Sequence, residues 1–386
     1  MMARALASSR RHVLCVVGAR PNFVKMAPIV QAFANLPEPV SVTLVHTGQH
    51  YGSAMTDRFF DTLGLPEPDF NLEVGSASHA LQTAEIMRRF EPVLLGVQPD
   101  AVLVAGDVNS TLACALVSQK LGIPVIHVEA GLRSYDRAMP EEINRTLTDH
   151  LADLLLTSEP AAQANLAREG IRGTVEYVGN VMIDSLLAHL PRALPLSAQL
   201  AQAGRAGWLQ AGEPYAVMTA HRPSNVDDYE ALSHTLALAR AVADKVALVF
   251  PLHPRTRAKI VGFGLEAQLA HPRLYAAEPL GYLEMLGAMR DCVAVITDSG
   301  GMQEEALVLG VPCITLRDTT ERPVTLDCGG NVLVADDHDK TLAALDGALR
   351  GLGKPQRKPA LWDGQAASRI ASATARWLET STRSIA

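Results

Sequence analysis

Short apolar runs alternate with helix-like segments along most of the chain, and this alternation constrains the fold more than any other feature. The first half contains six such runs, at 12–17, 41–47, 101–106, 124–130, 153–159 and 175–179. Continuous apolar strands separated by amphipathic helices are typical of a parallel sheet covered on both faces. We therefore predict an α/β fold with a doubly wound sheet in this half.

The same pattern restarts after a connecting segment at about 186–213 that is rich in Ala, Leu, Pro and Gln. A chain of 386 residues is also too long for one ordinary core. We predict two Rossmann-like, doubly wound domains that face each other across a cleft, at 12–185 and 186–365, with a terminal helix at 366–386 completing the first. Ligands are expected at the carboxyl ends of the strands, in that cleft.

Composition and charge exclude several classes of protein. The formal net charge is −7, so no basic surface indicates a nucleic-acid partner. No apolar stretch reaches the roughly 18 residues that a membrane-spanning helix needs, so no membrane partner is expected. Residues 1–11 are basic but lack a long apolar stretch, which favours a frayed tail over a signal peptide and a cytoplasmic location. The five cysteines show no CxxC spacing and are expected to be buried thiols.

A polar turn, Gly18-Ala-Arg20-Pro-Asn22-Phe-Val-Lys25, follows the first predicted strand. Arg20 and Lys25 lie near a helix start, where free N–H groups favour an anion; a solvated basic helix start is the alternative. The turn lacks the GxGxxG of dinucleotide folds, and no tyrosine has a lysine four residues later. NAD-dependent chemistry is therefore disfavoured, and no cofactor is expected.

Three carboxylates lie at or just beyond the ends of neighbouring predicted strands: Asp107, Glu129 and Glu141. Because acidic residues are disfavoured in an apolar sheet, their placement requires either a partner or a chemical task. Salt bridges to Arg133 and Arg145 are the structural alternative. Glu142 is a second candidate for the role assigned to Glu141.

The second half carries two histidines at strand ends, His221 and His253, each with an arginine one or two residues later. A lone histidine is more often structural, but this repeated arrangement favours a diphosphate pocket. Asp337-His-Asp339 resembles a metal-binding pair, yet it falls in a late polar loop that we interpret as solvated surface. With no HExxH motif and no spaced Cys/His set, no metal is expected.

A strand, a small-residue turn and a helix are predicted around Thr297-Asp-Ser299-Gly300-Gly301. The backbone amides of Ser299, Gly300 and Gly301 can approach phosphate oxygens closely because no side chain obstructs them. Glu305, further along the helix, is a candidate for binding ribose hydroxyls. A plain glycine-containing helix start is the alternative.

Long motifs make the chain resemble the non-hydrolysing UDP-N-acetylglucosamine 2-epimerases, a family with the two-domain GT-B architecture. Between about residues 13 and 336 they read GARPNFVKMAPI, TGQHY, GDVNSTLA, HVEAGLRS, MPEEINR, AHRPSN, TDSGGMQEEA and TTERP. The resemblance implies interconversion of UDP-N-acetylglucosamine and UDP-N-acetylmannosamine. In that reaction the C1–O bond to the diphosphate breaks, the C2 proton leaves to give a glycal and UDP, and UDP then re-adds. A homodimer and a role in cell envelope polysaccharide synthesis are also implied.

The resemblance further assigns roles to individual residues. Its catalytic residues match Asp107, Glu129, Glu141 and His221. The implied substrate-binding residues are Arg20, Lys25, Arg133, His253, Ser299, Gly300, Gly301, Glu305 and Arg322. Which carboxylate removes the C2 proton stays open.

Several positions depart from the family pattern. Asn22 and Ser224 stand where many members have Glu, and Gln49-His50 is followed by Tyr51 rather than leading to a second Gln. The last departure argues against activation by a second substrate molecule. A UDP-diacetamido-uronic acid substrate, a hydrolysing epimerase, a GT-B glycosyltransferase and a non-enzymatic UDP-sugar sensor are the competing hypotheses.

Overall fold

The structure, a computed structural model, describes residues 11–48 and 62–381. The expectations for the basic segment 1–10 and for the residues of TGQHY after Gly48 lie outside the described residues. The chain divides into two compact units, one formed by residues up to 185 together with those from 360 onward, the other by 186–359. Residues 360–365, expected in the second domain, thus fall in the first unit, where Trp362 Nε1 donates to the carbonyl of Ser158 at 2.9 Å.

The first unit is built on a seven-stranded sheet in which every described pairing is parallel. In spatial order its strands are β3 (Phe70–Asn71), β2 (Ser41–His46), β1 (His12–Val17), β4 (Ala101–Ala105), β5 (Val125–Val128), β6 (Leu154–Thr157) and β7 (Thr174–Tyr177). Sequence analysis missed β3 because this edge strand has two exposed residues and presents no apolar run.

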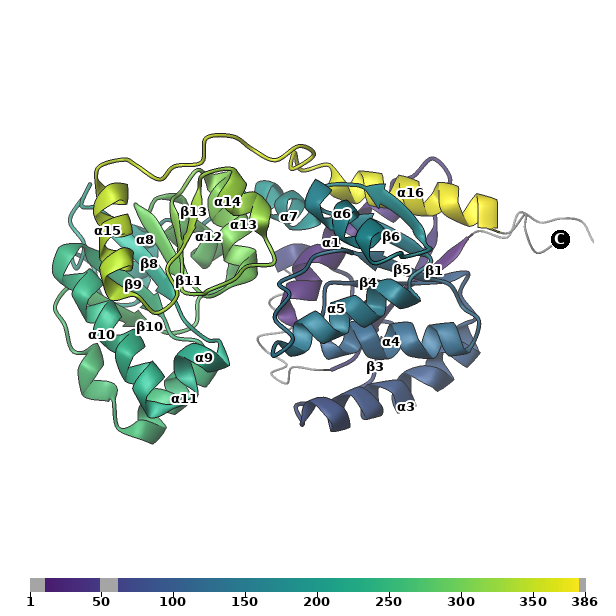
Figure 1. Cartoon of the computed structure of the whole chain (residues 1–386), viewed down its shortest axis with the longest axis horizontal. Helices are drawn as coiled ribbons and strands as arrows, with labels where there is room; N and C mark the ends of the chain where they lie inside the picture. The colour runs from purple at the N-terminus through teal and green to yellow at the C-terminus, as the bar shows by residue number, and fades with distance from the viewer. Residues whose placement is uncertain (1–10, 49–61, 382–386) are drawn as a thin grey trace, which may run out of the picture. The chain divides into compact units, whose positions relative to one another are not determined.

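Helices connect these strands and cover the sheet (Figure 1). They are α1 (Arg20–Ala34), α3 (His79–Val97), α4 (Asn109–Lys120), α5 (Pro140–Leu151), α6 (Pro160–Arg168) and the C-terminal α16 (Ala366–Ser381). Helix α4 lies between α3 and α5, while α16 packs against α1. Helix α7 (Val181–His189) runs across the boundary between the two units.

The second unit repeats the same plan with a six-stranded parallel sheet. Its strands lie in the order β10 (Leu274–Ala277), β9 (Ala247–Pro251), β8 (Tyr215–Thr219), β11 (Ala294–Thr297), β12 (Cys313–Thr315) and β13 (Asn331–Leu333). Its helical segments are the 3₁₀ turns η1 (Leu190–Arg192) and η2 (Glu266–Leu269) and the helices α8 (Leu196–Gln202), α9 (Pro223–Val226), α10 (Tyr229–Lys245), α11 (Pro254–Phe263), α12 (Tyr282–Arg290), α13 (Gly300–Leu309), α14 (Pro323–Asp327) and α15 (His338–Leu349). The predicted α/β class with two doubly wound sheets is confirmed.

Both faces of each sheet are buried, as the continuous apolar strands predicted. In the second unit, Met218 and Ile296 point into one core cluster, and their neighbours Val217 and Val295 point into another. Successive residues of a strand face opposite sides, so a strand covered on both sides must be apolar throughout. All five cysteines are free and buried, in agreement with the sequence analysis. Of the helices in the described ranges, none has the length and apolar character that crossing a lipid bilayer demands.

The strand order creates one reversal point in each sheet, between β1 and β4 in the first unit and between β8 and β11 in the second. Chain connections leave in opposite directions on the two sides of such a point, which opens a crevice at the carboxyl ends of the strands. We therefore expect the functional side chains among the polar groups that follow these four strands.

Gly131 allows a close approach between the loop after β5 and α6. Its φ of +82° lies in the left-handed region, and a Cβ atom there would stand 2.5 Å from the carbonyl oxygen of Ala162. Gly122 has a similar φ of +71°, but a Cβ atom on it would meet nothing within 4 Å. The two glycines therefore separate backbone strain from steric overlap.

We expect Gly131→Ala to destabilise the protein considerably more than Gly122→Ala. The strained backbone alone costs about 1–2 kcal/mol, which both variants share, whereas only the first also forces the backbone of α6 to move. Urea unfolding followed by circular dichroism measures both. Equal losses of unfolding free energy would contradict this account of the β5–α6 contact.

Candidate active site

A buried ion pair lies at the reversal point of the first sheet. The ammonium of Lys25, on α1, contacts the carboxylate of Glu129, which follows β5, and both side chains are more than nine-tenths buried. Gly106, after β4, has a φ of +69°, and a Cβ atom there would stand 3.0 Å from Lys25 Nζ and 3.7 Å from Glu129 Oε2. A glycine at this position is thus what lets the backbone pass next to the ion pair.

Glu129 itself holds an unusual backbone conformation, with a φ of +66°. For a residue with a side chain this left-handed geometry costs about 1–2 kcal/mol, so the surrounding structure must impose it. The backbone N–H groups of Glu129 and Ala130 both donate to the carbonyl of Leu156 on β6, at 3.0 and 3.2 Å. Strain of this kind concentrates at functional positions, which favours a chemical task for Glu129.

Asp107 and Arg145 form a second ion pair next to the first. Two guanidinium nitrogens of Arg145, on α5, lie 2.5 and 3.1 Å from Asp107 Oδ2. The Asp107 side chain is 26% exposed, whereas that of Arg145 is 3% exposed. The salt bridge considered as an alternative for Asp107 therefore exists, but it leaves part of this carboxylate open to solvent.

The neighbours Glu141 and Glu142 occupy different environments at the start of α5. Glu142 is buried and accepts hydrogen bonds of 2.9 Å from the backbone and hydroxyl of Ser134, from the Tyr135 backbone and from Arg145. Glu141 is half-buried and has no hydrogen-bonding or ionic partner among the described residues. Of the two candidates, Glu141 is therefore the one whose carboxylate is available.

Arg133, for which the resemblance implies substrate binding, lies in a buried polar network. Its guanidinium contacts Asp149 at 2.7 Å and Glu169 at 2.6 and 2.8 Å. Asp149 in turn contacts His127 Nδ1 at 2.7 Å, and His127 Nε2 lies 2.8 Å from the carbonyl of Gly106. The network does not bring Arg133 to Asp107 or Glu129, but it supports the turn that carries Gly106.

In the second unit, His221 lies at the reversal point of the sheet, directly after β8. Its Nδ1 is 2.8 Å from Oδ1 of Asp298, which follows the adjacent strand β11. The carboxylate is fully buried, while the His221 side chain is 36% exposed. Burial by itself lowers the pKa of His221, but the Asp298 carboxylate outweighs it and raises that pKa above its ordinary value.

His253, which follows β9, stands beside His221, with 5.3 Å between the ring centroids. Its Nδ1 accepts a hydrogen bond of 3.2 Å from the backbone N–H of Arg255 at the start of α11. The Arg255 side chain is paired with Asp227. The structure therefore brings the two predicted histidines together, while the nearby arginine already has a partner.

The small-residue turn forms the N-terminus of α13, with Ser299 as its N-cap. The backbone N–H of Ser299 is bonded to Thr297 Oγ1 at 3.0 Å, so of the three amides predicted to meet phosphate it already has a partner. A Cβ atom on Gly300 would lie 2.4 Å from Glu321 Oε1. A side chain at position 300 would thus displace the end of the Glu321 side chain, and Gly301 follows in the first turn of the helix.

Further along the turn region, Glu305 is buried on α13. Arg322, implied as a substrate-binding cation, is also buried, and its Nε lies 2.8 Å from Glu304 Oε1. The side chain of Arg20, the remaining candidate, lies outside what the structure describes. Within the described part of the chain, no group of three His, Cys, Asp or Glu residues is arranged to hold a metal ion.

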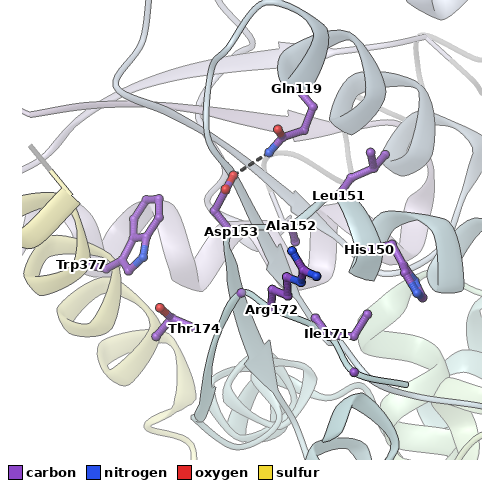
Figure 2. A pocket seen from close by; sticks show the side chains of 11 residues that line it. Gln119, His150, Leu151, Ala152, Asp153, Ile171, Arg172, Thr174 and Trp377 are labelled. Carbon is purple, nitrogen blue, oxygen red and sulfur yellow. Dashed lines mark hydrogen bonds between the residues drawn. The ribbon is translucent and has the colours of Figure 1, made fainter. Parts of the chain in front are cut away.

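A cavity of about 560 Å³ in the first unit is shown in Figure 2. It lies where β6 and β7 begin, whereas Asp107 and Glu129 follow the ends of β4 and β5. It is lined by the C-terminal ends of α4 and α5, by the loop leading into β7 and by Trp377 of α16. Asp153 accepts hydrogen bonds there from Gln119 and from the first backbone amide of β5. The cavity contains none of the candidate residues.

Asp298 and Arg145 are the partners that sequence reasoning did not assign. Asp298 directly follows a predicted strand next to the one that ends at His221, which is the signal that could have identified it. Arg145 was considered only as a generic salt-bridge partner, because no spacing rule shows that α5 returns to the end of β4.

Comparisons with known proteins identify one family. A profile of the UDP-N-acetylglucosamine 2-epimerase family matches residues 35–375. The chain is 41% identical over 339 residues to a UDP-N-acetylglucosamine 2-epimerase of Methanococcus maripaludis, covering 87% of this chain and 91% of the relative. It is 40% identical to the UDP-2,3-diacetamido-2,3-dideoxy-D-glucuronate 2-epimerase of Pseudomonas aeruginosa, covering 93% and 98%. A crystal structure of the Methanocaldococcus jannaschii UDP-GlcNAc 2-epimerase with UDP-GlcNAc and UDP matches with a TM-score of 0.86 at 39% identity, covering 95% of this chain and 99% of that one.

We expect Glu142→Ala to destabilise the protein by about 3–5 kcal/mol, because it leaves the buried Arg145 cation without one of its two carboxylates. The matched variant Glu141→Ala removes only a charge near a helix N-terminus, worth about 0.3–1 kcal/mol. Chemical denaturation of both variants measures the difference. A larger loss for Glu141→Ala would mean that the two carboxylates have exchanged environments.

Proposed function

The chain belongs to the UDP-N-acetylglucosamine 2-epimerase family, and we propose that it interconverts UDP-N-acetylglucosamine and UDP-N-acetylmannosamine without hydrolysing them. The proposed route is elimination of UDP to a glycal, followed by re-addition of UDP with the opposite configuration at C2. The observation that carries the proposal is the two ion-paired carboxylates at the end of the first sheet, together with a third carboxylate in the first turn of α5. Asp107 is ion-paired and partly exposed, Glu129 is ion-paired and buried, and Glu141 has no partner among the described residues.

Elimination at C1 and C2 demands both charge stabilisation and proton transfer. No carbonyl in the sugar ring acidifies the C2 proton, so breaking the C1–O bond first makes C1 electron-poor. A carboxylate placed next to such a centre stabilises it, and the ion-paired Glu129 and Asp107 are suited to this task. Removal and return of the proton on opposite faces require two acid–base groups, for which Asp107 and Glu141 have the accessible carboxylates.

The second unit carries groups suited to the nucleotide. His221 and His253 stand together at the ends of β8 and β9, and the first turn of α13 presents free backbone N–H groups in its Gly300-Gly301 segment. A helix N-terminus and a histidine cation both favour a diphosphate. We assign Glu305, which is buried on the same helix, to the ribose hydroxyls.

Two related activities remain as alternatives. The likeness to the Pseudomonas aeruginosa diacetamido-glucuronate epimerase favours a UDP-diacetamido-uronic acid as the second candidate substrate. Asn22, whose amide donates to the carbonyl of Ala105 at 2.7 Å, stands where many family members have Glu and is consistent with a changed substrate. A hydrolysing epimerase would release free N-acetylmannosamine and UDP.

The proposal includes a homodimer in the cytoplasm. Apolar side chains are exposed on two helices of the first unit, with Leu81 and Leu95 on α3 and Ile143 and Leu147 on α5. Burial of such side chains between two copies would remove apolar surface from water.

We expect the purified enzyme, given UDP-N-acetylglucosamine in heavy water without NAD, to form UDP-N-acetylmannosamine that carries deuterium at C2. The reason is that a proton removed by a side-chain carboxylate exchanges with solvent before it returns. Nuclear magnetic resonance and mass spectrometry of the nucleotide-sugar pool measure both product and label. Accumulation of free N-acetylmannosamine would identify the hydrolysing reaction. Turnover of only the diacetamido-uronic acid would identify the alternative substrate, and no exchange with either would contradict the proposal.

We expect Asp107→Asn to reduce turnover at least about 100-fold, because the amide cannot accept or return a proton. UDP binding should persist, since the groups assigned to the nucleotide lie in the second unit. Asp100→Asn is the matched control, because Asp100 precedes the same strand β4 at its opposite end. Isothermal calorimetry with UDP and steady-state turnover separate binding from chemistry. Wild-type turnover in Asp107→Asn would remove this residue from the mechanism.

A further inference from the structure

Asp298 is bound on both of its carboxylate oxygens to the turn that carries His221. Oδ1 lies 2.8 Å from His221 Nδ1. Oδ2 accepts the backbone N–H groups of His221 and Arg222, each at 2.8 Å, and the side-chain amide of Asn225 at 3.0 Å. Three donors on one oxygen hold the carboxylate plane in place, and therefore hold Oδ1 against the imidazole.

This arrangement bears on which imidazole nitrogen carries a proton. An ionised carboxylate can only accept hydrogen bonds, so its contact with Nδ1 of His221 at 2.8 Å favours a proton on that nitrogen. Burial alone would raise the pKa of Asp298, but His221 and the backbone donors lower it to about 2, so the carboxylate is ionised at neutral pH. Nε2 of His221 is then the nitrogen left for a ligand, on a side chain that is 36% exposed.

The other charged groups near His221 do not raise its pKa as Asp298 does. Arg222 donates through Nε to the carbonyl oxygen of Asp298 at 2.9 Å, and Arg255 is paired with Asp227; both cations oppose protonation of His221. His253 uses Nδ1 as an acceptor for a backbone N–H, which assigns that ring to the neutral form. Among these neighbours, Asp298 is the one that favours the imidazolium.

We propose that Asp298 is a positioning residue that holds Nδ1–H of the His221 imidazolium, which leaves the second N–H of that imidazolium, on Nε2, to donate to the diphosphate of the departing UDP. This inference rests on the proposed function for its ligand, but the Asp298–His221 pairing itself does not. Asp298 touches no substrate. It acts by orienting the ring of His221 and by favouring the imidazolium, which places a positive charge and an N–H donor where negative charge develops on the leaving diphosphate.

An asparagine at position 298 tests the proposal with little change in shape. Its carbonyl oxygen can take the place of Oδ2 and accept the same backbone donors, leaving its NH₂ group to face His221. Nδ1 must then become an acceptor, which forces the opposite tautomer and disfavours the second proton. Asp346→Asn is the matched control, because it neutralises another carboxylate of the second unit, one that pairs with Lys245 between α10 and α15.

The experiment has two readouts. The ¹⁵N resonances of His221 in the free protein should show the Nδ1-protonated tautomer and a titration above pH 6.5, the ordinary value for histidine. In Asp298→Asn that titration should move down by about one to two pH units, the effect of removing an opposite charge at this distance. UDP affinity and turnover should lose their alkaline limb at correspondingly lower pH. Asp346→Asn should leave all of these unchanged.

The outcomes distinguish a failure of the positioning role of Asp298 from a failure of the proposed epimerase function. A wild-type His221 that titrates at or below pH 6.5, or that carries its proton on Nε2, overturns the inference without any variant having to fold. An unchanged titration of His221 in Asp298→Asn overturns it as well. If the ¹⁵N shifts move as expected and UDP binding follows them, but no epimerised product forms, the positioning role stands and the proposed function fails.

Discussion

Burial of both faces of each sheet is the constraint on which the remaining structure depends. Strands such as β4 and β11 are buried along their whole length, so an uncompensated charge on them would lose its hydration with nothing in return. Charged side chains are therefore confined to the points where strands end. There Lys25 lies against Glu129, and His221 lies against Asp298.

The two units use the same topology to create opposite electrostatic environments. At the reversal point of the first sheet, carboxylates predominate, and Lys25 and Arg145 pair with them. At the reversal point of the second sheet, the buried carboxylate of Asp298 pairs with His221, and the start of α13 contributes the positive end of a helix dipole. The first arrangement suits an electron-poor carbon and a mobile proton, and the second suits a diphosphate. A reaction that separates a sugar from UDP requires both.

Candidate residues that look alike in the sequence differ in how many hydrogen-bonding and ionic partners their side chains have in the structure. Glu129 and Arg133 belong to one motif, yet Glu129 has a strained backbone at the sheet edge, while Arg133 is held between Asp149 and Glu169. Glu141 and Glu142 are adjacent, yet only Glu142 is surrounded by donors. Arg133 and Glu142 thus support the loops on which the accessible groups stand.

The alternation of apolar runs was sufficient to determine the α/β class and the repeated doubly wound plan, because strands buried on both faces must be apolar throughout. It also located Asp107, Glu129 and His221 at strand ends, since polar residues directly follow the runs. It could not show the edge strand β3, whose two residues carry no pattern. The sequence offered Arg145 as a salt-bridge partner without showing which carboxylate it meets. Only the tertiary structure shows that Arg145 reaches Asp107 across 38 positions and that Asp298 reaches His221 across 77. Spacing along the chain does not encode such contacts, because parallel strands and the helices between them bring distant residues to one edge. These long-range contacts determine which charged side chains are buried, which are ion-paired and which stay accessible.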